Sequence, residues 1–374
     1  MNRPDPEELV DRARVVALPM RERFRGIDVR EALLIEGEGG RWAEWSPFTE
    51  YGDAEAATWL AAALEAASAV PERATRDEGR RPERAQRVEG RRPERAQRDE
   101  GRRPERATRV EGRRIRVNAT VPAVPAAAVP AVLARFPGCR TAKVKVAQPG
   151  QSLDDDVARV AAVRAALGSA GRVRVDANGA WTLDEATTAL LALAAFGLEY
   201  AEQPVAGIRD LAALRERLDG AVRIAADESV RKPSDPLEVA RAGAADLLVL
   251  KCQPLGGASR ALAIAAEAGL PVVSSSALET SVGLAAALRF AAALEDTGMT
   301  SLGAGHELDH GLGTAALLAA DVTGDPLLPV DGAIAIREVA PDPELLDRCA
   351  AAPERRAWWL ARLRRCATLA YSPE

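Results

Sequence analysis

Five ionisable residues recur at a nearly constant spacing through the middle of the chain, and each ends a short run that is typical of a β-strand. Intervals of 31, 26, 25 and 24 residues separate Lys145, Asp176, Glu202, Asp227 and Lys251. One strand, one helix and their loops take roughly 25 to 30 residues. The spacing therefore predicts parallel strands that alternate with helices. In a β/α barrel the carboxyl ends of such strands meet at one rim, where the chemistry takes place.

Eight strand-like runs support an α/β barrel over residues 115–327. The runs are residues 115–120, 141–146, 172–176, 198–202, 223–227, 247–251, 271–275 and a short one at 301–302. Amphipathic segments lie between them, such as 154–167 and 182–195. The second of these opens with Thr182 and Glu185, which form the pattern of a helix capping box. Eight parallel strands with intervening helices are the architecture of a TIM-like barrel.

The two ends of the chain predict a smaller α+β domain. Residues 1–70 contain strand-like runs at 14–18, 30–36 and 41–48, followed by an alanine-rich helix from about 53 to 69. The tail, residues 328–374, contains the strand-like GAIAIREV and a helix that carries Trp358 and Trp359. We expect this tail to pack against the N-terminal region.

Residues 71–114 are four 11-residue copies of a sequence close to PERAQRDEGRR. Each copy contains a proline, a glycine and almost no apolar residue, so a helical stripe and a buried seam are both missing. This composition predicts a disordered linker. A basic arm that binds nucleic acid is the alternative, but the 16 arginines alternate with 10 acidic residues, and no aromatic residue is present to stack on bases.

Charge and cysteine content narrow the class of protein. The net charge of the 374 residues is −5 although the repeats carry an excess of arginine, so the rest of the chain is acidic and does not predict a nucleic-acid surface. The four cysteines are scattered, with no CxxC pair, and predict reduced thiols rather than a disulfide framework or a zinc site. No apolar run approaches a membrane span. A cytoplasmic protein without a membrane partner is expected.

Three lysines are candidates for acid–base chemistry. In TAKVKVA, Lys143 and Lys145 are two residues apart, so within a strand both point to the same face. Buried ammonium groups are costly, and each lowers the pKa of the other, which favours a base near neutral pH. Lys251 ends the sixth predicted strand, across the barrel from Lys145. Taken alone, a KxK pattern is also compatible with an exposed edge strand.

The acidic strand ends predict a metal site. Asp176, Glu202 and Asp227 end three consecutive strands, and an all-oxygen ligand set favours Mg²⁺ over zinc. Singly, each would be read as a helix cap or an ion-pair partner. Arg174 on the inward face and Asn178 beyond the strand end are supporting candidates. Glu228, beside Asp227, is expected to stand behind the ligands rather than among them.

A serine-rich segment after the seventh strand is the candidate for a second anion-binding group. Ser274, Ser275 and Ser276 begin SSSALETSVG, whose hydroxyl and backbone N–H groups suit a carboxylate of the substrate. The alternative is an ordinary serine-rich helix N-terminus. With the metal and the lysines, the site is suited to removing a proton next to the carboxylate of a small-molecule substrate.

These motifs resemble the muconate-lactonizing subgroup of the enolase superfamily. The resemblance rests on KxK, on the Asp of DAN, the Glu of EQP and the Asp of DES, and on the lysine of the sixth strand. It implies a (β/α)7β barrel, a capping domain built from both chain ends, and a Mg²⁺ site with the three carboxylates as ligands. The 44-residue repeat block departs from the subgroup's pattern, which has a short linker there.

The resemblance also implies roles for the lysines. Lys145 would remove and return the proton, Lys251 would stabilise an enediolate, and Lys143 would tune Lys145. The segment PMRERFRGI, residues 19–27, resembles a mobile loop that closes over the substrate; which of Arg21, Arg23, Phe24 or Arg25 touches substrate is open, as is a purely solvated loop.

Three functions remain open from the sequence. SSALETSVG and GGRWAEWSPF are similar to actinobacterial members of the subgroup that eliminate water from a succinyl-substituted cyclohexadiene carboxylate in menaquinone biosynthesis. The same lysines suit racemisation of N-acylamino acids or epimerisation of dipeptides. The third hypothesis is an inactive barrel that binds partners through its arginine-rich repeat. Oligomeric state is not predicted, although a monomer is compatible with the sequence.

Overall fold

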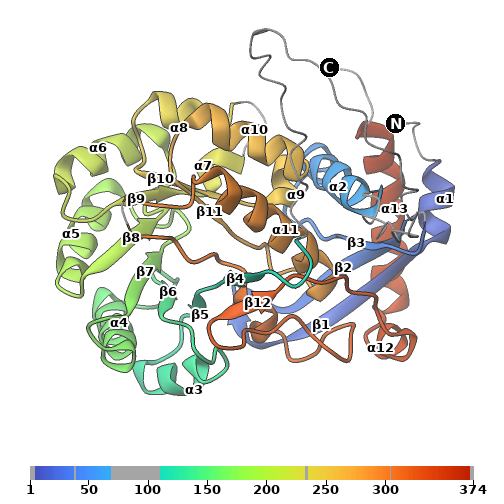
Figure 1. Ribbon diagram of the computed structural model, residues 1–374, viewed down its shortest axis with the longest axis horizontal. Coiled ribbons are helices and arrows are strands. Elements are labelled where there is room, and N and C mark those ends of the chain that lie inside the picture. The colour runs from blue at the N-terminus through green and yellow to red at the C-terminus, as the bar shows by residue number, and fades with distance from the viewer. Residues whose placement is uncertain (1–4, 38, 69–109, 232–234, 304, 371–374) are drawn as a thin grey trace, which may run out of the picture. The chain divides into compact units, whose positions relative to one another are not determined.

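The computed structural model describes residues 5–37, 39–68, 110–231, 235–303 and 305–370, which belong to one compact unit. A seven-stranded parallel sheet forms its centre, in the strand order β11-β10-β9-β8-β7-β6-β5 (Figure 1). These strands are β5 (Ala119–Val121), β6 (Thr141–Lys145), β7 (Arg172–Asp176), β8 (Leu198–Glu202), β9 (Ile224–Ala226), β10 (Leu247–Leu250) and β11 (Val272–Ser274). The parallel order confirms the predicted α/β class. The composition of the repeats predicts a disordered linker over residues 71–114, of which residues 71–109 lie outside the described ranges. The prediction is wrong at its end, because Arg113 forms ion pairs with Glu295 and Asp296 and Arg114 begins a β-strand.

Helices alternate with these strands along the chain, and the longer ones line the outer side of the sheet (Figure 1), whereas the short α7 and α9 directly follow the ends of β9 and β10. The helices are α3 (Val129–Leu133), α4 (Leu153–Leu167), α5 (Leu183–Ala194), α6 (Ile208–Leu218), α7 (Glu228–Arg231), α8 (Glu238–Arg241), α9 (Cys252–Leu255), α10 (Ala258–Ala268) and α11 (Ser281–Thr297). Capping boxes begin α4 and α5, where Ser152 pairs with Asp155 and Thr182 with Glu185. The second box is the one that the sequence predicted. None of the helices in the described ranges combines the length and hydropathy of a membrane span.

The eighth strand position is not where the sequence predicted it. Ser301 forms only an isolated bridge to Glu307. The sheet closes instead through His310 and Gly311, which form parallel bridges to Val117 and Ser275. A Cβ atom at Gly311 would come within 2.6 Å of the Ser275 Oγ, so glycine permits this close approach. A two-residue closure has no strand-like period, which is why the sequence pattern missed it.

The predicted first barrel strand is divided between two sheets. Residues Arg114–Arg116 form β4, which pairs antiparallel with β12 (Ala333–Ala335) of the tail. Residues Ala119–Val121 form β5, which pairs in parallel with β6. The turn between them is fixed by hydrogen bonds from the N–H of Val117 to the Gly332 carbonyl and from the N–H of Asn118 to the His310 carbonyl.

The N-terminal region forms a three-stranded antiparallel sheet with helices beside it. Its elements are α1 (Pro6–Asp11), β1 (Ala13–Phe24), β2 (Ile27–Glu36), β3 (Trp42–Trp45) and α2 (Asp53–Ser68). The segment 19–27, predicted as a loop, is the end of a long β-hairpin whose turn is Arg25–Gly26. Both turn residues have positive φ, and the register shifts between Pro19 and Phe24. The sequence of this segment is typical of a charged loop. It is ordered because it pairs with β2 and because the N–H of Ala319 donates a hydrogen bond to the Pro19 carbonyl.

The tail contains two helices, α12 (Pro343–Arg348) and α13 (Pro353–Leu369), and α13 packs against the N-terminal region (Figure 1). Trp359 of α13 is fully buried and packs edge-on against Trp45, with ring centroids 5.5 Å apart. Its indole N–H donates to Glu31, which also accepts two hydrogen bonds from Arg355. All four cysteines are free thiols, as the sequence predicted.

A buried ionic cluster joins β3 to the start of α11. Glu44 accepts hydrogen bonds from the Thr280 N–H (2.9 Å), the Thr280 hydroxyl (2.6 Å) and the Ser46 hydroxyl (2.6 Å). Arg30 lies beside it and donates to the carbonyl oxygens of Ala277 and Leu278, each at 3.1 Å. Burial, and next the neighbouring Glu279 carboxyl, raise the pKa of Glu44 to about 7. This contact fixes the N-terminal sheet to the loop that follows β11.

The raised pKa of Glu44 predicts a pH-dependent stability. Between the ordinary pKa of 4.5 and the folded value of about 7, the folded chain holds a proton that the unfolded chain has released. Stability from this group therefore falls as the pH rises through that window. Relative to the parent chain, Glu44→Gln is expected to gain up to roughly 3 kcal/mol in free energy of unfolding between pH 5 and pH 8.

Urea unfolding at the two pH values measures this difference. Glu36→Gln, at an exposed position on β2, is the matched control and is expected to show no such gain. An identical pH dependence for Glu44→Gln and the parent chain would contradict the assignment.

Candidate active site

The register of the sheet places three of the five spaced residues in one row. Lys145 on β6 pairs with Asp176 on β7, and Asp176 pairs with Glu202 on β8. All three are the last residues of their strands, and Asp227 and Lys251 directly follow β9 and β10. The five side chains are buried, as is that of Lys143. The structure therefore brings together, at one rim, all the residues that the spacing predicted there.

The lysines of β6 contact the carboxylates of the next two strands. The Nζ of Lys145 lies 2.6 Å from the Asp176 Oδ2 and 2.5 Å from the Asn178 Oδ1. The Nζ of Lys143 lies 2.9 Å from both oxygens of Glu202 and 3.1 Å from the Asp176 Oδ2. The ammonium of Lys143 thus stands between two carboxylates, whereas that of Lys145 is held by one carboxylate and one amide.

The two lysines of the KxK pair differ in their pKa shifts. Burial lowers the pKa of Lys145, and although Asp176 opposes this, the Lys143 charge adds to it. For Lys143, burial is outweighed by the Glu202 and Asp176 carboxylates, which raise its pKa. Burial also lowers the pKa of Lys251. Only one member of the pair therefore has the lowered pKa that the sequence analysis expected of both.

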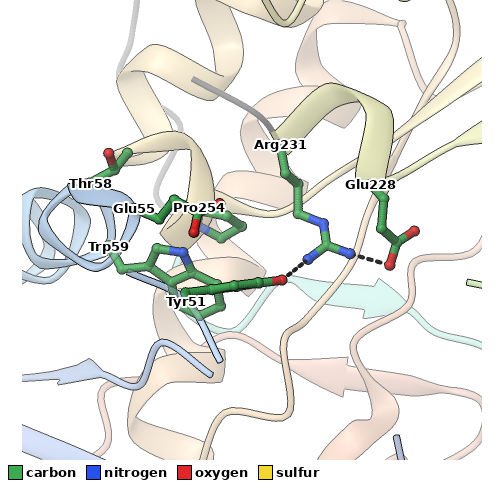
Figure 2. A pocket seen from close by; sticks show the side chains of 7 residues that line it. All are labelled: Tyr51, Glu55, Thr58, Trp59, Glu228, Arg231 and Pro254. Atoms are coloured by element: carbon green, nitrogen blue, oxygen red, sulfur yellow. Dashed lines mark hydrogen bonds and ion pairs between the residues drawn. The ribbon is translucent and has the colours of Figure 1, made fainter. Parts of the chain in front are cut away.

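On the other side of the rim, Asp227 is held by two cations. Lys251 forms an ion pair with the Oδ2 of Asp227, and Arg231 of α7 contacts both carboxylate oxygens of Asp227. The Arg231 side chain is drawn in Figure 2. Burial opposes ionisation, but Arg231 and then Lys251 keep the pKa of Asp227 below its usual range. Glu228 lies behind Asp227, where it accepts hydrogen bonds from Arg231 and from the Asn178 amide. Sequence reasoning did not identify Arg231.

A cavity opens over this row of side chains. Its lining comprises Phe24, Arg25, Phe48, Thr120, Lys143, Lys145, Asp176, Asn178, Lys251, Ser275, Ser276, Ala277, Leu278, Gly311 and Thr314. The N-terminal sheet contributes the hairpin tip, where the Phe24 ring centroid is 5.1 Å from the Lys145 Nζ. Of the four candidates on the hairpin, Phe24 and Arg25 line the cavity. Arg25 also stacks on Phe48, with its guanidinium carbon 4.6 Å from the ring centroid.

The chain has only four lysines among its 50 basic residues, and three of them line this cavity. Arginine cannot release its proton in a protein, whereas a buried lysine can act as a base. In a chain that otherwise uses arginine, lysine is thus kept where its chemistry differs from that of arginine.

The serine segment divides into residues that face the cavity and one that does not. Ser275 and Ser276 line it, and the Ser276 hydroxyl lies 2.5 Å from the Thr314 hydroxyl. Ser274 is fully buried outside the lining, and its N–H donates to the His310 Nδ1. The N-terminus of α11 faces Glu44, so a carboxylate of the protein itself occupies it. Thr120, on a predicted strand end, is a cavity residue that sequence reasoning missed.

Arg174 points inward, but toward the opposite end of the strands from the lysines. Its Nε donates to Glu199, and its Nη1 donates to the Asn118 Oδ1 (2.9 Å) and to the Asp309 carbonyl (2.7 Å). Its guanidinium also stacks on Tyr200, 4.7 Å from the ring centroid. These contacts make Arg174 part of the barrel interior beneath the site.

The donor set suits a hard divalent cation. Three buried carboxylates supply oxygen ligands only, and burial and then the Asp176 charge raise the pKa of Glu202 to about 7. Within the described ranges, no three acidic, histidine or cysteine side chains are already gathered around one point, because lysine ammonium groups lie between the carboxylates. Asp176, Glu202 and Asp227 would hold a metal once these lysines give way.

Similar proteins match nearly the whole chain. The chain is 50% identical over 367 residues to the o-succinylbenzoate synthase of Mycobacterium ulcerans (strain Agy99), covering 97% of this chain and 96% of the relative. It is 49% identical over 369 residues to the o-succinylbenzoate synthase of Mycobacterium tuberculosis (strain ATCC 25618 / H37Rv), covering 98% and 97%. The chain belongs to the o-succinylbenzoate synthase family. That family lies within the enolase superfamily, whose N-terminal-domain-like model matches residues 15–67 and whose C-terminal-domain-like model matches residues 127–341.

Solved structures of the superfamily share the fold of this o-succinylbenzoate synthase family member. The muconate lactonizing enzyme from Pseudomonas fluorescens matches with a TM-score of 0.65 at 20% identity, covering 91% of this chain and 98% of that one. The L-Ala-D/L-Glu epimerase from Bacillus subtilis matches with a TM-score of 0.63 at 21% identity, covering 88% and 96%. At these identities the likeness concerns the fold, and the chemistry is argued from the site.

Proposed function

We propose that the chain is an o-succinylbenzoate synthase, a hydro-lyase of menaquinone biosynthesis. It would convert 2-succinyl-6-hydroxy-2,4-cyclohexadiene-1-carboxylate to 2-succinylbenzoate by syn elimination of water. The observation that carries the proposal is that Lys145 and Lys251, from β6 and from the end of β10, line one cavity together with the buried Asp176 carboxylate. Identity near 50% to o-succinylbenzoate synthases over nearly the whole chain supports dehydration as the outcome.

In the proposed mechanism Lys145 acts twice. As the neutral amine, its Nζ takes the proton from the ring carbon that bears the carboxylate, and the electron pair of that C–H bond forms an enediolate. The enediolate then collapses, the bond to the neighbouring hydroxyl group breaks, and Lys145 returns its proton to the departing hydroxide as water. One residue serves both steps because the proton and the hydroxyl leave from the same face. The ring becomes aromatic, so no oxidant is needed.

The remaining residues hold charge during these steps. The Lys251 ammonium would face the enediolate from the other side of the cavity, where burial makes its positive charge effective. Lys143 would keep a positive charge beside Lys145, and Asn178 would orient the Lys145 Nζ through its 2.5 Å contact. Asp176, Glu202 and Asp227 would hold Mg²⁺, which when bound supplies positive charge for the substrate carboxylate. Ser275 and Ser276 would contact the succinyl carboxylate.

Racemisation of N-acylamino acids or epimerisation of dipeptides is the second candidate. Two lysines on opposite sides of one cavity also suit proton transfer between the two faces of an α-carbon. The test compares both substrates with purified protein and Mg²⁺. We expect dehydration of the cyclohexadiene carboxylate; α-hydrogen exchange of N-succinyl amino acids without dehydration would favour the racemase and contradict the main proposal.

A cytoplasmic enzyme that acts on a small-molecule carboxylate, without a nucleic-acid or membrane partner, completes the proposal. The arginine-rich repeat provides the test of a partner-binding role. Deletion of residues 71–109 is expected to leave turnover unchanged. Lost turnover, or loss of a bound partner in a pull-down with the full chain, would show that the repeat has a function of its own.

A further inference from the structure

Arg231 connects the N-terminal region to one of the proposed metal ligands. Its guanidinium contacts both oxygens of Asp227, with the Nε 2.9 Å from the Oδ1 and an Nη2 3.1 Å from the Oδ2. The same Nη2 contacts Glu228, and the Nη1 donates to the Tyr51 hydroxyl at 2.8 Å (Figure 2). Only 7% of the Arg231 side chain is exposed. Its donors are therefore divided between the barrel and Tyr51.

Tyr51 belongs to an aromatic cluster that also reaches the substrate cavity. Its ring lies edge-on to Phe48 and tilted against Trp59, with centroids 5.9 Å apart in each case. Phe48 lines the cavity, and its ring is covered by Arg25 of the hairpin tip. Figure 2 shows the Tyr51 hydroxyl pointing at Arg231 from the side opposite Glu228. Tyr51 thus packs directly against Phe48, a residue of the cavity lining.

We propose that Arg231 is a positioning residue that fixes the Asp227 carboxylate for metal binding, and that Tyr51 couples this position to the docking of the N-terminal region. The inference rests on the proposed function, because Asp227 is assigned there as a metal ligand. A planar guanidinium holds a carboxylate in one orientation, which an ammonium cannot do. A carboxylate has about four lone-pair positions, so contacts to Arg231 leave positions for a cation.

The competing explanation is an ion pair that only stabilises the fold. Two substitutions separate the explanations. Tyr51→Phe removes one hydroxyl and leaves the ring cluster in place. Arg231→Lys keeps the positive charge but cannot reach Tyr51 and both Asp227 oxygens together. Arg355→Lys is the matched control, since Arg355 forms a similar two-point contact with Glu31 away from the cavity.

The test measures Mn²⁺ affinity of the full-length chain by electron paramagnetic resonance, alongside melting temperature. Partners behind metal ligands commonly change metal affinity by about 10- to 100-fold, so Arg231→Lys is expected to weaken Mn²⁺ binding to that extent. Tyr51→Phe is expected to weaken it less, by a few-fold, at an unchanged melting temperature. Arg355→Lys is expected to bind Mn²⁺ as the parent chain does.

Unchanged Mn²⁺ affinity in Arg231→Lys would overturn the positioning role, whatever its melting temperature. If Arg231→Lys does not fold, Tyr51→Phe decides: unchanged affinity overturns the coupling, and weakened affinity supports it. The parent chain separates this inference from the proposed function. Mn²⁺ binding with the expected variant order but without dehydration would refute the function alone, whereas a parent chain that binds no Mn²⁺ would refute the inference.

Discussion

Replacement of Lys145 by alanine is expected to lower kcat for dehydration by about 10⁴-fold, because the proposed mechanism uses this one amine both to remove and to return the proton. Mg²⁺ binding is expected to persist, since the three carboxylates proposed as ligands, Asp176, Glu202 and Asp227, are all retained. Single-turnover kinetics measure the first effect, and Mn²⁺ titration measures the second.

Lys145→Met is the control for packing, because it retains an unbranched side chain next to Phe24. The alanine and methionine variants are expected to be equally inactive. Turnover within tenfold of the parent chain in either variant would exclude Lys145 as the base and leave Lys251 as the candidate for that role.

The second large effect is expected for Glu202→Gln. The substitution removes one of the three carboxylates proposed as metal ligands and leaves Lys143 without its closest carboxylate partner. We expect the affinity for Mn²⁺ to fall by at least about 100-fold, and dehydration with it. Metal titration followed by activity at saturating Mg²⁺ measures both.

The matched control is Glu199→Gln on the same strand, which changes a carboxylate that pairs with Arg174 and His306 outside the cavity lining. It is expected to affect stability rather than metal affinity. In the parent chain, EDTA is expected to abolish turnover and Mg²⁺ to restore it. Full activity of Glu202→Gln in the presence of EDTA would contradict a metal-dependent site.

Much of the fold could be predicted because its strands and helices follow local rules. The strand–helix period and the capping box at Thr182 depend on residues close together in the sequence. The errors fall where distant segments decide the structure. Residues Pro19 to Ile27 form a hairpin because β2 and the loop at Ala319 pair with them, and the barrel closes at Gly311 because no side chain intervenes there.

The candidate site divides in the same way. The end of a strand can be recognised from the sequence, so the row formed by Lys145, Asp176 and Glu202 could be predicted. Tyr51 and Arg231 contact each other although they are 180 positions apart in the sequence, and no local sequence pattern predicts this contact. The unequal pKa shifts of Lys143 and Lys145 also depend on which carboxylates each lysine reaches in three dimensions.

The scarcity of lysine makes this chain unusually accessible to spectroscopy. Reductive methylation with a ¹³C label modifies amines but leaves arginine unchanged, so four lysines and the N-terminus are the only targets in the whole sequence. Three of those labels would report from within one cavity. Comparison of the parent chain with single lysine variants would assign each signal, and the protonation of each cavity amine could then be followed directly as metal and substrate are added.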